Sequence, residues 1–170
     1  VLGASLIAST WVMPGPAGAV STGTSTLTVA ADTWTNPAKA TTSYGSSTSL
    51  QVGVSGSSRR DLYFSVDPSA LPQDVRETQL SLRLTPASKT PRGTGSLVMY
   101  RLDSAPTWSE SGLTYASRVP CNGANGVQLG GPVPVPAAST APVTITSSAS
   151  VSQALLSGSR TTLCLTMAGS

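Results

Sequence analysis

The sequence lacks histidine altogether and has little charge and few aromatic rings: 10% of its 170 residues are charged and 5% are aromatic. Without an imidazole, Ser-His-Asp and Cys-His catalysis, histidine-ligated zinc and histidine pH switches are excluded. Ten basic and seven acidic residues give a net charge of +3, and only Arg59 and Arg60 are adjacent basic residues. Because nucleic-acid binding needs clustered basic side chains, we expect no nucleic-acid partner.

Serine and threonine are the most frequent residues, with 28 and 22 copies, and the sequence also has 16 glycines and 13 prolines. This composition is typical of secreted β-rich proteins, and disorder is the competing interpretation. Hydrophobic residues nevertheless reach 39% and fall into short alternating runs, such as Leu80-Ser81-Leu82-Arg83-Leu84. Alternation predicts strands with one buried face, and the length suits one domain. We therefore expect a folded domain with flexible ends.

The N-terminal region has the features of a secretion signal. No charged residue precedes Asp32, and an apolar stretch over residues 1–13 is followed by Pro14-Gly15-Pro16 and Ala17-Gly18-Ala19. This is the order of an apolar segment, a helix breaker and a cleavage site between small residues. We expect residues 1–19 to be a partial signal peptide cleaved after Ala19. The alternative is a buried strand or helix of the domain.

Residues 20–26 are predicted to be a flexible Ser/Thr/Gly spacer, and the domain is predicted over residues 27–170. The apolar run at the N-terminus is shorter than a helix that crosses a bilayer, so no permanent membrane span is expected. Signal peptides normally begin with a methionine and a basic segment, which are absent before Val1. We therefore expect the sequence to be part of a longer secreted chain.

The two cysteines, Cys121 and Cys164, are expected to form one disulfide. A secreted chain matures in an oxidising compartment, where an even pair of cysteines is normally bridged. Without histidine, two lone cysteines are a poor metal site, and their spacing is unlike the CxxC of redox pairs.

The hydrophobic pattern predicts an all-β fold. Strands are predicted in about eight short runs, at residues 27–30, 50–54, 61–66, 80–84, 96–102, 113–115, 143–146 and 162–167. Residues 150–156 form the one predicted short helix, and Pro132, Pro134 and Pro136 predict an extended passage at a sheet edge. Such strands are best buried as a two-sheet antiparallel jelly-roll β-sandwich with at most one short helix. An immunoglobulin-like sandwich is the runner-up, but its Cys, Trp, Cys order is absent.

Several segments, taken in order, carry a family resemblance. They are Ala31-Asp32-Thr33-Trp34, Ser43-Tyr44-Gly45-Ser46 before Val52-Gly53, residues 59–66 before Leu71-Pro72, residues 78–84, Trp108-Ser109-Glu110 with Leu113-Thr114-Tyr115, and residues 151–158. Together they resemble the secreted bacterial DNRLRE domain, which is related to carbohydrate-binding module family ninety-six, over residues 27–167. The sequence departs from the family pattern at Phe64-Ser65-Val66, where Phe-Asp-Leu is usual, and over residues 122–142.

The resemblance implies a jelly roll on secreted or surface proteins, often attached to larger enzymes or adhesins. Some family members bind polysaccharides such as alginate. The expected partner is therefore a polysaccharide or a cell-surface glycan, with acidic polymers as one candidate class.

Sugar-binding sandwiches stack pyranose faces on exposed aromatic rings and bond the hydroxyls with polar side chains. Trp34 and Tyr44 lie in or beside polar loop sequence near Asn36 and Lys39, so these four residues are the first candidates for a carbohydrate-binding site. The alternative is that both rings cover an end of the core. The resemblance favours a structural role for Trp108.

Arg59 and Arg101 complete the predicted carbohydrate-binding set. Arg59 precedes a predicted central strand, where it reaches an acidic sugar or pairs with Asp61 or another nearby carboxylate. Arg101 interrupts an apolar strand, so it faces solvent or marks a concave binding face.

No cofactor is expected, and a structural calcium is the alternative. Calcium needs several oxygen ligands, for which Asp32 and Asp61 are the leading candidates, but no DxDxDG-like cluster is present. No catalysis is expected either, because the seven acids form no obvious pair for glycoside hydrolysis. A polysaccharide lyase built on Tyr63, or on Tyr100 with Arg101, is not excluded by the sequence.

The prediction is a secreted, non-catalytic, disulfide-bonded module that binds a cell-wall or matrix polysaccharide. One alternative is a structural or adhesive surface domain that acts as a spacer without a ligand. Another is the accessory domain of a larger secreted hydrolase.

Overall fold

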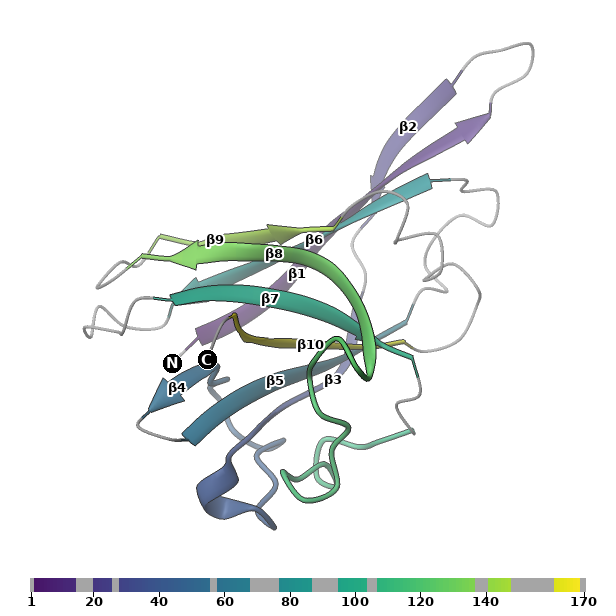
Figure 1. The fold of residues 1–170 in the computed structure, drawn as a ribbon. Coiled ribbons are helices and arrows are strands. Elements are labelled where there is room, and N and C mark those ends of the chain that lie inside the picture. Colours follow the sequence, from purple (N-terminus) through teal and green to yellow (C-terminus); the bar gives the residue numbers. More distant parts are fainter. Residues whose placement is uncertain are drawn as a thin grey trace.

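The computed structural model describes residues 2–14, 20–25, 28–55, 58–67, 77–86, 95–103, 107–136, 141–147 and 161–168. These residues form strands that are layered as two sheets (Figure 1). The strands are β1 (Leu2–Pro14), β2 (Val20–Ser25), β3 (Thr28–Thr35), β4 (Gly53–Ser55), β5 (Ser58–Asp67), β6 (Glu77–Pro86), β7 (Gly95–Leu102), β8 (Gly126–Val135), β9 (Val143–Thr146) and β10 (Thr161–Met167).

One sheet has four strands in the order β2-β1-β6-β9, and the other has six, in the order β3-β5-β10-β7-β8 with β4 paired to β5. All of these pairings are antiparallel. The predicted all-β sandwich of two antiparallel sheets is confirmed. The helical structure in the described residues is the 3-10 helix η2 (Pro37–Lys39), and the helix predicted over residues 150–156 lies outside them.

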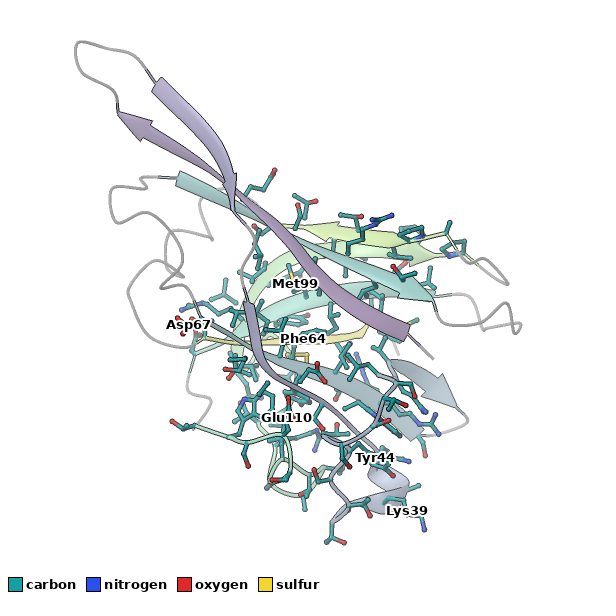
Figure 2. The ribbon with its side chains drawn as sticks, turned by 180° about the vertical axis from the view of Figure 1, so that it is seen from behind. Lys39, Tyr44, Phe64, Asp67, Met99 and Glu110 are labelled. Atoms are coloured by element: carbon teal, nitrogen blue, oxygen red, sulfur yellow. A yellow bond between two sulfur atoms is a disulfide. The ribbon has the colours of Figure 1, made fainter. Side chains whose placement is uncertain are left out.

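The main core lies between the sheets. Leu80, Leu82 and Leu84 of β6 are at most 1% exposed, while the residues between them are more accessible, as the alternating pattern predicts. From the six-stranded sheet, Phe64 and Met99 point into the same core and lie in the middle of the molecule (Figure 2).

A second, smaller core covers the outer face of the six-stranded sheet, which is the face turned away from the four-stranded sheet. It contains Tyr63, Leu102, Leu113, Cys121 and Cys164. The predicted disulfide between Cys121 and Cys164 is present and ties the connection between β7 and β8 to the central strand β10. Strands β5 and β10 are therefore buried on both faces, so that even polar side chains such as those of Asp61, Ser65 and Thr162 are buried.

One local prediction differs from the structure. Residues 113–115 form no strand, because Leu113 is buried in the second core within a turn-rich connection. The extended passage predicted at a sheet edge is confirmed, since Pro132 and Pro134 belong to the ten-residue strand β8, which pairs with β7 at the edge of its sheet. Prolines are tolerated there because an edge strand leaves one side of its backbone without a ladder.

Strand β1 occupies most of the segment predicted to be a secretion signal, and the predicted spacer contains β2. Strand β1 pairs with β6, for example Leu6 with Leu82, and its far end pairs with β2. The paired ends of β1 and β2 project beyond the rest of the sandwich (Figure 1). This arrangement corresponds to the alternative of a strand of the domain, whereas cleavage after Ala19 and the domain boundaries remain predictions. In the described part of the chain, no helix has the length and hydropathy of a membrane span.

Candidate functional site

A groove of about 250 Å³ lies on the outer face of the six-stranded sheet. Its lining residues come from β5, β7, β8, β10 and the turn beside the disulfide: Arg59, Val98, Tyr100, Cys121, Asn122, Gln128, Pro132, Thr166, Met167 and Ala168. We call this set the outer groove. Strand alternation explains its floor, because Leu97 and Met99 point into the main core and therefore Val98 and Tyr100 point outward.

The turn that follows Cys121 borders the outer groove. The Asn122 Oδ1 accepts hydrogen bonds from the Ala124 amide at 3.1 Å and from the Asn125 side chain at 2.8 Å, which is an Asx turn of the kind that an Asn-Gly pair favours. Gly123 faces the Tyr100 ring, since a Cβ at that position would lie 3.8 Å from the ring. The disulfide and this turn therefore place a half-buried tyrosine beside an exposed amide side chain.

Arg59 enters the outer groove from the start of β5. Its Nε donates a 2.7 Å hydrogen bond to the Thr166 Oγ1, and its Nη2 donates to the Met167 carbonyl oxygen. The Thr166 hydroxyl in turn donates a 2.5 Å hydrogen bond to the Asp61 Oδ1. Of the two alternatives for Arg59, the pairing with a nearby carboxylate is confirmed, with 3.6 Å between the Arg59 Nε and that same Asp61 oxygen.

Asp61 is 4% exposed and lies between two arginines. Its other carboxylate oxygen is 3.8 Å from the Arg118 Nε. Burial raises the pKa of Asp61 above its ordinary value, while the Thr166 hydrogen bond and the charges of Arg118 and Arg59 act in the opposite direction. Burial likewise raises the pKa of Tyr63, whose hydroxyl donates a 2.9 Å hydrogen bond to the Val119 carbonyl oxygen.

Trp34 and Tyr44 lie at another place, at the end of the main core. Trp34 is 5% exposed, and its ring stacks on that of Tyr44 with the centroids 3.7 Å apart. The expectation that Trp34 offers an open stacking surface is therefore wrong for this structure, because the core and the Tyr44 ring cover it. Tyr44 is half-buried, and this packing matches the alternative that the two rings close the end of the core.

Asn36 and Lys39 belong to the same end of the sandwich, where Figure 2 shows Lys39 and Tyr44. Asn36 is buried and caps η2, because its Oδ1 accepts the Ala38 amide hydrogen at 3.0 Å. Lys39 is exposed in the last turn of that helix. The sequence-predicted set is thus divided: these residues lie with Tyr44, and Arg59 lines the outer groove.

Arg101 and Asp32 lie elsewhere. The Arg101 Nη2 donates a 2.6 Å hydrogen bond to the Asp103 carboxylate, and its side chain is 23% exposed. The Asp32 amide donates to the Glu110 carboxylate at 3.3 Å, and burial together with the Glu110 charge raises the pKa of Asp32. Within the described ranges, no three acidic or cysteine side chains gather as a metal site. Calcium binding at Asp32 or Asp61 remains a prediction.

The sequence does not predict the outer groove as a unit. Tyr100 lies between Met99 and Arg101 in a predicted strand, so strand alternation places its side chain on the face opposite to that of Met99. Nothing in the sequence near Asn122 and Gln128 predicts that they lie close to Arg59, because this proximity depends on the disulfide and on the pairing of β7 with β8.

Comparison with known proteins identifies a family that the chain matches. A search among curated proteins found no match. The model of Carbohydrate-binding module family 96 matches residues 23–131, which is more than half of the chain. The match takes in β3 to β7 and the beginning of β8, with six outer-groove residues, among them Arg59, Tyr100, Asn122 and Gln128. The chain therefore belongs to carbohydrate-binding module family 96.

Proposed function

We propose that this chain is a non-catalytic module that binds a cell-wall or matrix polysaccharide in the outer groove. The observation that carries the proposal is the meeting of an aromatic ring, Tyr100, with the side chains of Arg59, Asn122 and Gln128 in one depression of a carbohydrate-binding family member. Aromatic rings pack against the apolar faces of sugars, and amide and guanidinium groups bond their hydroxyls.

The size and shape of the outer groove favour part of a long ligand over a whole small one. Its volume of about 250 Å³ is below the roughly 300–1,000 Å³ of pockets that enclose drug-sized molecules. We therefore propose that one sugar unit occupies the groove and that the rest of the polymer continues over the exposed surface. Gln128 and Asn122 are exposed at its border and suited to bond neighbouring hydroxyls.

The charge of the outer groove favours an acidic polymer. Arg59 is the charged residue among its lining residues, and the chain as a whole carries +3. A carboxylate on the bound sugar would gain a charge-assisted hydrogen bond from a guanidinium.

A binding role without chemistry is supported by the positions of the candidate catalytic groups. Hydrolysis of glycosides needs two carboxyl groups on either side of the bond, and the outer-groove residues include none. Tyr100 and Arg101, the pair considered for a lyase, are neighbours on β7 and point to opposite faces of the sheet. We further propose an extracellular location as part of a longer chain, with which the disulfide is compatible.

A spacer or adhesive domain without a sugar ligand is the second candidate. The specific observation in its favour is the burial of Trp34, with Tyr44 half-buried against it, because a spacer has no need of open aromatic rings.

The test is retention of the full chain on a glycan array and on insoluble acidic and neutral polysaccharides. We expect binding that Tyr100→Ala and Gln128→Ala each weaken while circular dichroism shows an unchanged fold. Tyr44→Ala and Lys39→Ala are the matched controls and should bind as the wild type does. Weakening in the Tyr44 and Lys39 variants alone would move the site to the end of the core. Absence of binding to every polymer would favour the spacer.

A further inference from the structure

Three polar side chains of the outer face form one connected group beside the outer groove. Arg59 and Asp61 are two residues apart on β5 and therefore project from the same face of the strand. Thr166 lies beside Asp61 on the adjacent strand, because Leu165 is paired with Leu62. Sheet pairing thus brings together residues that are more than 100 positions apart in the sequence.

The direction of each hydrogen bond in this group is determined by its chemistry. A guanidinium can only donate, so the Thr166 oxygen accepts from the Arg59 Nε at 2.7 Å. The hydroxyl has a single hydrogen, which it directs to the Asp61 carboxylate at 2.5 Å. Arg59 is held a second time where its Nη2 donates to the Met167 carbonyl oxygen. The guanidinium is therefore fixed in orientation through side-chain and backbone partners.

The single negative charge of Asp61 lies near two positively charged arginines. The buried carboxylate faces Arg59 on one side and Arg118 on the other. Arg118 is not among the outer-groove residues, and it donates to the Tyr115 carbonyl oxygen at 2.6 Å and lies over the Tyr115 ring. One negative charge thus lies between two positive ones, which leaves positive charge at the groove, where the Arg59 side chain is 36% exposed.

From this geometry we propose that Thr166 and Asp61 are positioning residues that hold the Arg59 guanidinium at the outer groove, so that the module selects sugars bearing a carboxylate over their neutral counterparts. The inference rests on the proposed function and deepens it. An arginine with a free side chain loses rotamer entropy when it binds a ligand, whereas an arginine already held in place loses little. The hydroxyl of Thr166 therefore contributes to specificity as well as to packing.

The experiment measures the affinity of the full chain for alginate and polygalacturonate, each compared with its esterified, neutral form. The readout is the ratio of the acidic to the neutral affinity, which a general loss of structure would not change selectively. The variants are Arg59→Ala, Arg59→Lys, Thr166→Val and Thr166→Ser. Lysine keeps the charge but has no Nε–H for Thr166, valine keeps the shape of threonine without the hydroxyl, and serine keeps the hydroxyl.

We expect the wild type to prefer the acidic polymers and Arg59→Ala to lower the ratio by about tenfold, the order expected for a charge-assisted hydrogen bond. Thr166→Val and Arg59→Lys should each lower the ratio several-fold, and Thr166→Ser should keep the wild-type ratio. Arg59 is partly exposed, so Arg59→Lys decides the question if the buried valine variant fails to fold.

A wild-type ratio in Arg59→Lys and in folded Thr166→Val would overturn the proposal, because charge alone would then suffice. A Thr166→Ser variant as impaired as Thr166→Val would also overturn it. If the wild type binds acidic and neutral polymers equally through Tyr100, the carbohydrate-binding function stands and this inference fails. If it binds no polymer, both fail.

Discussion

Gly45 lies where the loop over residues 36–49 meets the backbone of Glu110. The Ser43 hydroxyl donates a 2.7 Å hydrogen bond to the Glu110 carbonyl oxygen, and a Cβ on Gly45 would lie 2.0 Å from that oxygen. Glycine is therefore required here for close packing of two backbones rather than for an unusual backbone angle. Both segments belong to those that resemble the family pattern.

We expect Gly45→Ala to lower the free energy of unfolding by about 1–3 kcal/mol, because the backbone of Glu110 must shift to admit the methyl group. Urea denaturation measures this change. Gly123→Ala is the matched control, since its methyl group would meet the Tyr100 ring at an ordinary contact distance of 3.8 Å. Equal midpoints for the two variants would contradict the argument.

Asp61 gives the protein a pH dependence with a definite sign. An unfolded aspartate titrates near 3.8, and burial raises the pKa of Asp61 in the folded chain. The folded state therefore holds the proton more tightly than the unfolded state does. Its contribution to stability is fully present below pH 3.8 and is lost as the pH rises through the folded pKa.

We accordingly expect the unfolding free energy of the wild type, minus that of Asp61→Asn, to decrease as the pH rises through this window and then to level off. Urea titrations of both proteins from about pH 3 to about pH 8 measure the difference, in which the other carboxyl groups largely cancel. A difference that increases with pH would show that the arginines outweigh burial.

At the scale of elements, the disulfide ties the connection between β7 and β8 to the sheet. Residues 107–125 cover the second core, and Cys121 anchors them to Cys164 of β10. The Tyr63 hydroxyl and the Trp108 indole, which donates a 3.0 Å hydrogen bond to the Thr162 hydroxyl, add polar attachments to this region.

Reduction of the disulfide should lower the free energy of unfolding by about 4 kcal/mol, the chain-entropy value for a loop of this length. The bridged cysteines are 43 residues apart. Guanidinium denaturation with and without reductant measures the loss, and a Cys121→Ala/Cys164→Ala double variant should not respond to reductant. An unchanged midpoint in the reduced wild type would mean that packing alone holds the connection.

Strand patterns were predictable where one face of a strand is buried. In β6, leucine alternates with polar residues, so its register and its inward face follow from the sequence. In β5, the residues from Asp61 to Val66 are all buried, polar ones included, and the sequence does not tell which of them meet which layer. Tyr63 belongs to the second core and Phe64 to the main core, and that division needs the second layer formed by residues 107–125.

At the scale of the whole molecule, one core joins the two sheets. Leu82 of the four-stranded sheet and Leu163 of the six-stranded sheet are both 0% exposed and belong to the same cluster. Because small domains with one shared core unfold cooperatively, the sheets should not unfold separately.

Leu82→Ala and Leu163→Ala should each lower the free energy of unfolding by about 2–5 kcal/mol within a single transition. Tryptophan fluorescence and circular dichroism during denaturation should give coincident curves. Val54→Ala is the control, since Val54 is 47% exposed and its loss should cost no more than about 0.5 kcal/mol. Two separated transitions in either leucine variant would show that the sheets are independent units.

The amino-acid order alone was enough for the fold class, most strands, the disulfide and the family resemblance, because these depend on patterns within short segments or on composition. The site required the fold. Trp34 lies in a polar stretch of sequence but is buried in the folded chain. Arg59 contacts Thr166 only because β5 pairs with β10. Pairing of distant strands determines which outward-facing side chains become neighbours, and a local pattern carries no information about that pairing.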